Sequence, residues 1–186
     1  MKRPVETMRN EQGVTSFGLI QVYTGDGKGK TTAAIGQAIR ACGHGAQVIM
    51  IQFMKGREYG ELKCAREVER FEILQFGRDE FVDRANPAER DIRYAKQGLA
   101  AAQEVMEGKR CDLLILDEIN VAIDYGLVAV EDVVTMLKGK PEGMEVILTG
   151  RNAAQEVIET AHLVTEMQEI KHPYQQGIEM RKGIDY

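Results

Sequence analysis

With 186 residues, the chain is long enough for one globular domain with a single hydrophobic core. Hydrophobic residues make up 44% and charged residues 28%, which is ordinary for a folded protein and argues against extended disorder. The net charge of −5 argues against broad nucleic-acid binding, and no apolar run is long enough to span a membrane.

The N-terminal residues Met1–Gly13 are polar and lack the apolar core of a secretory signal. The three cysteines are scattered, form no C-x-x-C pair and are odd in number. We therefore expect a reduced, cytoplasmic protein without a disulfide framework or a structural zinc site.

Residues 1–17 are predicted to be an N-terminal arm and residues 18–186 a single α/β domain. In this domain, short apolar runs of strand length alternate with segments of helical spacing. In chain order, we expect a strand at Gly18–Tyr23, a helix at Thr31–Cys42, strands at Gln47–Phe53 and Arg70–Phe76, a helix from Pro87 to Glu107, a strand at Leu113–Leu116, a helix at Val130–Leu137, a strand at Glu145–Thr149, a helix at Asn152–Ala161 and a short strand at Leu163–Met167.

Helix ends are indicated by their capping residues. Asn86 is a suitable N-cap, Pro87 suits the first helical position, and Glu89 lies three residues after the cap. Gly43 and Gly108 stand where helix C-terminal glycines belong.

Alternating strands and helices predict a three-layer α/β fold, with a mainly parallel sheet between two layers of helices. Ligands of such sheets bind beyond the carboxyl ends of the strands. Three polar clusters follow predicted strands at this edge, namely Gly25–Thr32, Asp117-Glu118 and Thr149–Arg151. Their shared placement predicts a ligand site there.

The segment Thr24–Thr32, Thr-Gly-Asp-Gly-Lys-Gly-Lys-Thr-Thr, predicts a phosphate-binding loop. Its glycines, Gly25, Gly27 and Gly29, allow backbone amides to approach phosphates closely. Lys30 supplies a positive charge to the terminal phosphates, and Thr31 an oxygen ligand for Mg²⁺. The strict template wants glycine where Thr24 stands. A glycine-rich turn with a coincidental Lys-Thr pair is disfavoured, because a strand precedes the loop and a helix follows it.

Two charged residues of the loop need separate interpretation. A carboxylate inside a phosphate loop is electrostatically unfavourable, so we expect Asp26 to point away from the phosphates, toward sugar hydroxyls. Lys28 can either contact phosphate or stay solvated, and phosphate contact is slightly favoured.

The apolar run Leu113–Leu116 ends in Asp117 and Glu118, which places two carboxylates near the expected Mg²⁺. Spacing alone leaves open which of the two contacts the ion. Arg151 follows the next strand and could hold phosphate oxygens, although a plain surface arginine fits nearly as well. His44 is expected in a turn after a helix, and the spread of the histidines does not support a histidine metal site.

Several short motifs recur together in order and spacing, and as a set they resemble the cob(I)alamin (corrinoid) adenosyltransferases of the cobalamin-synthesis and corrinoid-salvage type. The resemblance runs from about Gly18 to Tyr186. It is carried by Thr24–Thr32, Arg40–Gly45 (Arg-Ala-Cys-Gly-His-Gly), Gln52–Gly56 (Gln-Phe-Met-Lys-Gly), Leu116–Glu118, Thr149–Arg151 and the ending Lys182–Tyr186 (Lys-Gly-Ile-Asp-Tyr).

The resemblance implies a RecA-like P-loop fold, a homodimer, and transfer of the 5′-deoxyadenosyl group of ATP to the Co(I) of a reduced corrinoid, with triphosphate as the leaving group. It also implies a free flavin or a flavodoxin-type partner as reductant. By position, Lys30 would neutralise phosphate charge, Thr31 and Glu118 would hold Mg²⁺, and Asp117 would lie beside them. The remaining loop residues, Gly25, Asp26, Gly27, Lys28, Gly29 and Thr32, would line the triphosphate and ribose, with Arg40 and Arg151 as further contacts.

The chain also departs from the family pattern. Family members often carry Asn at the position of Asp26, and some carry a Phe-x-Trp pair after a glycine. Here Gly77 is followed by Arg78-Asp-Glu-Phe81, and the chain has no tryptophan. Phe76 and Phe81 are the nearby aromatic residues, so Phe81 is the expected corrinoid contact.

Two other functions remain open from the sequence. The first is a small-molecule kinase or ATPase, in which Arg78, Arg84, Arg90 and Arg93 would form a lid over the phosphates. The second is a non-enzymatic, ATP-gated module that escorts corrinoid. A GTPase is disfavoured because no Asn-Lys-x-Asp motif occurs.

Overall fold

Six strands pair side by side in one parallel sheet, in the order β3-β2-β4-β5-β1-β6. The computed structural model describes residues 17–185, so the predicted N-terminal arm lies outside the described residues apart from Phe17. The strands are β1 Ile20–Thr24, β2 Val48–Phe53, β3 Phe71–Phe76, β4 Leu113–Asp117, β5 Glu145–Thr149 and β6 Leu163–Glu166. The helices are α1 Lys30–Gly43, α2 Gly60–Glu67, α3 Glu89–Glu107, α4 Ile119–Asp124, α5 Val130–Lys138 and α6 Gln155–Thr160, followed by the 3₁₀ helix η1 Pro173–Gln176.

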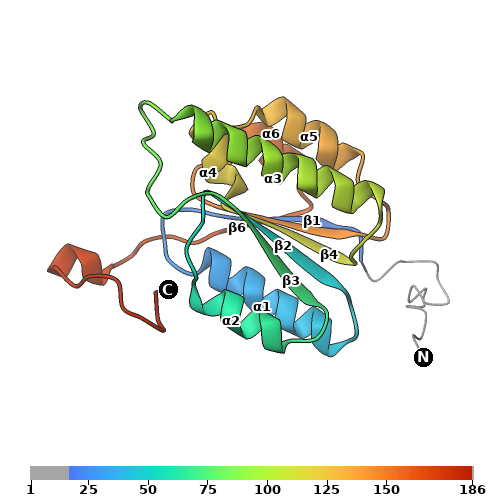
Figure 1. Cartoon of the computed structure of the whole chain (residues 1–186), viewed down its shortest axis with the longest axis horizontal. Coiled ribbons are helices and arrows are strands. Elements are labelled where there is room, and N and C mark those ends of the chain that lie inside the picture. The colour runs from blue at the N-terminus through green and yellow to red at the C-terminus, as the bar shows by residue number, and fades with distance from the viewer. Residues whose placement is uncertain (1–16, 186) are drawn as a thin grey trace.

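Helices cover both faces of the sheet, as predicted. Figure 1 shows α1 and α2 on one face and α3, α4, α5 and α6 on the other. The three-layer α/β prediction is therefore confirmed. None of the helices in residues 17–185 is long and apolar enough to cross a membrane.

The core lies on both sides of the central strands, in which every residue of β2, β4 and β5 is buried. On one side, α1 presents Ala34, Ala38 and Ala41 to the sheet, and these small side chains let the helix lie close to the strands. On the other side, α3 and α5 contribute larger side chains such as Leu99 and Leu137. Burial of both sheet faces explains why the central strands are continuous apolar runs.

Some predicted helix ends are shifted in the structure. Helix α3 begins at Glu89, two residues after Pro87. Its N-cap is Ala88, and the Ala88 N–H donates to the Asp91 carboxylate at 3.3 Å, which fixes the first turn at this point. Helix α1 includes Gly43, and the left-handed residue that ends it is Gly45 (φ 85°). His44 follows this helix as its C-cap, in the turn that was expected.

Two α-helices and the 3₁₀ helix η1 were not predicted. Helix α2 has only eight residues, begins at a glycine and buries only Ala65, so its few apolar residues do not distinguish it from a loop in the sequence. Helix α4 has six residues and follows β4 with a single residue between them, so its apolar side chains merge with the strand pattern.

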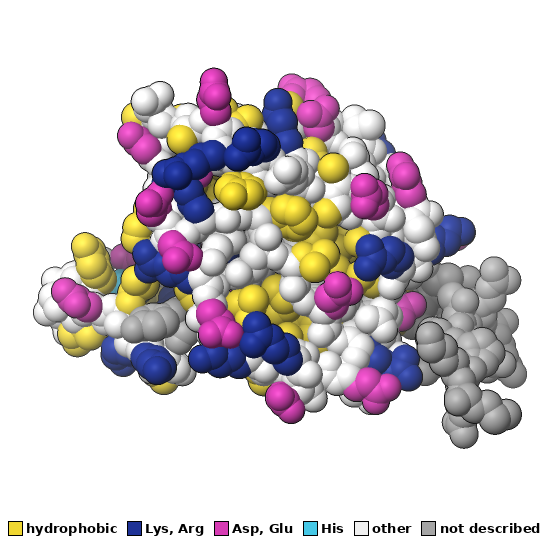
Figure 2. All heavy atoms as spheres, in the orientation of Figure 1, with side chains coloured by type: hydrophobic (Ala, Val, Ile, Leu, Met, Phe, Trp, Pro, Cys, Tyr) yellow, Lys and Arg dark blue, Asp and Glu magenta, His cyan; other side chains and the backbone are white. Residues whose placement is uncertain are grey.

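Figure 2 shows basic and acidic side chains interspersed on the face in view. On that face, the described residues form no continuous basic stripe of the kind that nucleic-acid binding uses.

Candidate active site

The phosphate loop connects β1 to α1, and its glycines are required by backbone geometry as well as by ligand access. Gly25 and Gly29 have φ values of 91° and 118°, which side-chain-bearing residues rarely adopt. A Cβ atom on Gly27 would lie 2.6 Å from the carbonyl oxygen of Gln168, and the Gly27 amide donates to the Met167 carbonyl at 2.6 Å. The loop is therefore packed backbone to backbone against the segment that follows β6.

Lys30 begins α1 and reaches back across the loop. Its Nζ donates to the carbonyl oxygens of Gly25 and Gly27 at 2.6 and 2.7 Å. Burial lowers the pKa of this ammonium, and the nearby Arg151 guanidinium adds to the effect, while Glu118 opposes it. The ammonium is thus held at the loop, where the sequence analysis expected it.

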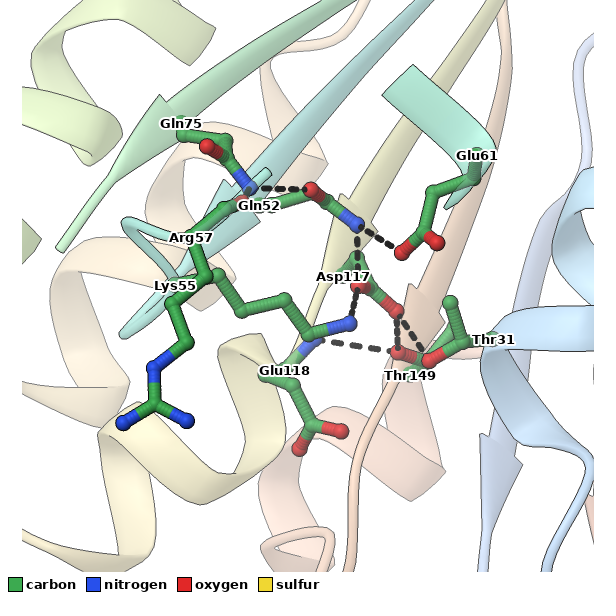
Figure 3. A network of polar contacts seen from close by, with 9 residues as sticks. All are labelled: Thr31, Gln52, Lys55, Arg57, Glu61, Gln75, Asp117, Glu118 and Thr149. Atoms are coloured by element: carbon green, nitrogen blue, oxygen red, sulfur yellow. Dashed lines mark hydrogen bonds and ion pairs between the residues drawn. The ribbon is translucent and has the colours of Figure 1, made fainter. Parts of the chain in front are cut away.

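Asp117, the last residue of β4, is the centre of a buried polar network (Figure 3). Its Oδ1 accepts hydrogen bonds from the hydroxyls of Thr31 (2.8 Å) and Thr149 (2.7 Å). Its Oδ2 accepts from Lys55 Nζ (2.7 Å) and Gln52 Nε2 (3.2 Å). The side chain is 0% exposed. Four elements that are distant in sequence therefore meet at one carboxylate.

Glu118 follows Asp117 and turns the chain sharply from β4 into α4. It is left-handed (φ 63°), and its N–H donates to the Thr149 hydroxyl at 3.0 Å. Strained backbone of this kind in a non-glycine residue is often found at functional sites. Burial, together with the Asp117 carboxylate, raises the pKa of Glu118. Glu118 lines the cavity beside the phosphate loop.

Gln52 and Lys55 were not among the site residues predicted from the sequence. Burial opposes the charge of Lys55, but the Asp117 carboxylate outweighs it and raises the pKa of the ammonium. The loop that carries Lys55 is fixed by close packing, because a Cβ atom on Gly77 would lie 2.3 Å from the Lys55 nitrogen. A signal for Gln52 was present, since it is an uncharged polar residue in the otherwise apolar run Val48–Phe53.

Gln52 links this network to neighbouring elements. Besides Asp117, it donates to Glu61 at 3.2 Å and accepts from Gln75 at 3.0 Å. Gln75 also donates to the Arg57 carbonyl at 3.0 Å, so the chain of amides ties β3 to the loop after β2. Figure 3 shows this row of side chains running from Gln75 to Asp117.

Replacing Gln52 with leucine is expected to lower the free energy of unfolding by about 1–3 kcal/mol, because buried partners lose their hydrogen bonds. Urea unfolding followed by circular dichroism measures this. The matched control is Gln155→Leu on α6, whose amide bonds an exposed Glu159; its effect should stay within about 0.5 kcal/mol. Equal stability of the two variants would contradict a structural role for Gln52.

A cavity of about 720 Å³ lies beside the phosphate loop. Its walls include Phe81, whose ring is 83% exposed and lies 5.9 Å from the Arg57 guanidinium. Of the residues predicted from sequence, the following line it: Asp26, Gly27, Lys28, Gly29, Lys30, Thr31, Thr32, Phe81, Glu118 and Arg151. The C-terminal segment also contributes to the wall, which the sequence analysis did not anticipate.

Asp26 and Arg151 face each other at the rim of this cavity. Arg151 Nε lies 3.8 Å from the Asp26 carboxylate, and its guanidinium donates to the Asp26 carbonyl at 3.2 Å. Because this arginine neutralises the acidic residue, the loop can carry a carboxylate without exposing phosphates to its full charge.

Arg40, predicted to be a nucleotide contact, does not line this cavity. It lies ten residues into α1, about 15 Å along the helix from Lys30 at 1.5 Å per residue. Its guanidinium bonds Gln37 instead, at 3.0 Å.

The arginine lid expected of a kinase is not formed by the described residues. Arg78 pairs with Asp91 (2.6 Å), Arg84 with Asp124 (2.9 Å) and Arg90 with Glu80 (2.8 Å). Arg93 lies against the Tyr94 ring, at 5.9 Å from its centroid. All four are outside the cavity wall.

A parallel sheet, a glycine-rich loop that leads into a helix, and a carboxylate at the end of a neighbouring strand define a P-loop nucleotide-binding protein of RecA-like fold. A solved structure of similar fold is the KaiC-like protein PH0186 from Pyrococcus horikoshii OT3. The TM-score is 0.51 and the identity 15%, with 86% of this chain and 76% of that chain covered.

The chain belongs to the family described as ATP:corrinoid adenosyltransferase BtuR/CobO/CobP, whose model matches residues 16–186. A corrinoid adenosyltransferase of a Sinorhizobium species is 40% identical over 176 residues, covering 91% of this chain and 80% of that protein. The corrinoid adenosyltransferase of Escherichia coli K12 is 36% identical, with 96% and 90% covered. The corrinoid adenosyltransferase CobA of Salmonella typhimurium is 34% identical, with the same coverage.

Proposed function

We propose that this protein transfers the 5′-deoxyadenosyl group of ATP to the Co(I) of a reduced corrinoid and releases triphosphate. Family membership supports the reaction. The observation that carries the proposal is the cavity of about 720 Å³, whose wall contains both the phosphate loop and the aromatic side chain of Phe81. Such a cavity combines a phosphate-binding loop with apolar side chains suited to a second substrate.

In this reaction, cobalt forms a bond to C5′ while the C5′–O bond breaks. The electron pair of the C5′–O bond leaves with the triphosphate. Co(I) is a strong nucleophile, so the protein has two tasks: to hold C5′ close to cobalt and to stabilise the departing negative charge. Lys30 and the loop serve the second task. Phe81 and the apolar side chains of the C-terminal segment, which line the same cavity, serve the first.

Thr31, Asp117 and Glu118 fit a Mg²⁺ site completed by phosphate oxygens and water. Within residues 17–185, no group of three or more His, Cys, Asp and Glu residues could hold a metal ion alone. Mg²⁺ needs only one or two carboxylates besides phosphates. Both Asp117 oxygens already accept hydrogen bonds, so Glu118 is the better direct ligand and Asp117 orients the Thr31 hydroxyl. Bound Mg²⁺ would neutralise part of the triphosphate charge.

We further infer that residues 18–186 act as one catalytic domain in a cytoplasmic homodimer. The β6 side chains support this dimer, because Leu163 and Val164 stay exposed at the sheet edge. A free flavin or a flavodoxin-type protein is proposed as the reductant. The second subunit and the reductant are both proposed from the family resemblance of the sequence.

The test is to incubate the protein with ATP, Mg²⁺ and chemically reduced corrinoid, and to follow the corrin absorbance as the cobalt–carbon bond forms. Triphosphate, resolved by ion-exchange chromatography, should appear in step with that change, and EDTA should suppress both. ADP formed without corrinoid would overturn the proposal in favour of an ATPase. One equivalent of product without further turnover would indicate an escort protein.

A further inference from the structure

Residues 168–185, here called the C-terminal strap, leave β6 and turn back toward the phosphate loop (Figure 1). Among the described residues, the strap is joined to the rest of the protein by hydrogen bonds and ion pairs at one side chain, Lys28. Its Nζ donates to the Ile184 carbonyl at 3.2 Å and to the Asp185 carboxylate. Lys28 therefore belongs both to the phosphate loop and to the attachment of the strap.

The end of the strap is folded so that Asp185 faces Lys28. The Arg181 N–H and Nε both donate to Asp185 Oδ2, at 2.8 and 3.2 Å, and the Asp185 N–H donates to the Arg181 carbonyl at 2.8 Å. Gly183, with φ 79°, allows this tight turn. Oδ2 is thus held inside the turn, which leaves Oδ1 for the Lys28 ammonium.

Beyond Gln168, whose backbone packs against Gly27, the strap packs weakly apart from the contact with Lys28. Its large apolar side chains Tyr174, Ile178, Met180 and Ile184 line the cavity, yet they are 46–73% exposed. Burial of apolar area is the main source of stability for such a segment. The far end of the strap therefore depends on Lys28 for its position until a ligand covers its apolar side.

A lysine ammonium has three N–H donors, and Lys28 uses them for two strap oxygens while it also lines the phosphate end of the cavity. A triphosphate on the loop would compete for this ammonium and would be repelled by the Asp185 carboxylate.

We propose that Asp185 is a positioning residue that holds the strap closed through Lys28. Because Asp185 shares the Lys28 ammonium with the phosphate loop, it also weakens the binding of triphosphate to the loop. Closure of the strap over the second substrate and binding of triphosphate to the phosphate loop then oppose each other, because both use the Lys28 ammonium. The naming of this second substrate as corrinoid rests on the proposed function. The coupling also favours release of the triphosphate product, since the strap carboxylate regains Lys28 as the phosphate leaves.

The test compares Asp185→Asn with the unchanged protein, using inorganic tripolyphosphate and isothermal titration calorimetry without corrinoid. Loss of the carboxylate frees Lys28 and removes one negative charge, so binding should tighten by up to about fivefold, the size of one exposed ion pair. Trypsin should also cleave the variant faster than the unchanged protein after Arg181 or Lys182. In turnover assays, KM for ATP should fall while KM for corrinoid rises, a split that general destabilisation would not produce.

Three further variants complete the test. Glu169→Gln removes the same charge from the strap without touching Lys28 and should leave all four readouts unchanged. Asp185→Glu keeps the carboxylate and should restore them. Lys28→Met should free the strap to trypsin but weaken tripolyphosphate binding. Unchanged or weaker tripolyphosphate binding in Asp185→Asn would overturn the inference. If binding and proteolysis change as expected while neither the unchanged protein nor any variant adenosylates corrinoid, the coupling of the strap to Lys28 stands and the proposed function fails.

Discussion

Replacing Lys30 with methionine is expected to lower kcat/KM for adenosyl transfer by a factor of about 10²–10³. Methionine keeps the length and the apolar part of the side chain but removes the charge. In the structure, the ammonium is held at the loop by the carbonyls of Gly25 and Gly27. A charge-assisted hydrogen bond contributes about 1.5–3 kcal/mol, and the contribution grows when charge develops on the leaving group.

This prediction is checked by steady-state kinetics of the corrin absorbance change at varied ATP concentration. The matched control is Arg40→Met on the same helix, because Arg40 lies outside the cavity and bonds Gln37. Its kcat/KM should stay within about twofold of that of the unchanged protein, since it removes only a solvated charge. A Lys30→Met variant that keeps more than a tenth of the activity would contradict the role of the loop. A large loss in Arg40→Met would show that the helix end contributes to the site after all.

The predicted fold was confirmed where the signal is local. The run Leu113–Leu116 is a buried strand flanked by polar residues, and its apolar continuity is what burial on both faces requires. The phosphate loop is equally local, since its glycines, Lys30 and Thr31 lie within seven consecutive residues. Short-range patterns of this kind depend little on the rest of the fold.

The partners of Asp117 could not be predicted in the same way. Lys55 lies 62 residues before Asp117, and they meet only because β2 and β4 are neighbours in the sheet. Strand order is set by how helices pack on the sheet, which the pattern of a single segment does not reveal. For the same reason, the C-terminal segment gave no sign that it returns to the phosphate loop.

Arg40 was assigned to the site on resemblance alone, and it does not line the cavity. The rise of 1.5 Å per residue along an α-helix already separates it from Lys30 by about 15 Å. Helical geometry, applied to the predicted helix Thr31–Cys42, already indicated that Arg40 would lie away from Lys30. Phe81, in contrast, was assigned as the nearby aromatic and does line the cavity.

The Asp117→Asn variant is expected to lose about 3–5 kcal/mol of the free energy of unfolding, because it leaves the Lys55 ammonium largely buried without its carboxylate. Adenosyl transfer should fall by about 10²-fold in the same variant, since the group that orients the Thr31 hydroxyl loses its charge. Urea unfolding gives the first quantity and the corrin absorbance assay the second. Glu58→Gln, which breaks an exposed pair with Arg66, is the control and should cost less than about 1 kcal/mol.

The two effects of Asp117 can be separated by adding Lys55→Met to Asp117→Asn. The second substitution removes the unpaired ammonium, so most of the lost stability should return. Activity should stay low, because neither asparagine nor methionine restores the negative charge beside Thr31 and Glu118. If the double variant regained activity along with stability, Asp117 would serve only to compensate Lys55. If stability did not return, the hydrogen bonds from Thr31, Thr149 and Gln52, rather than the ion pair, would dominate the energetics of this network.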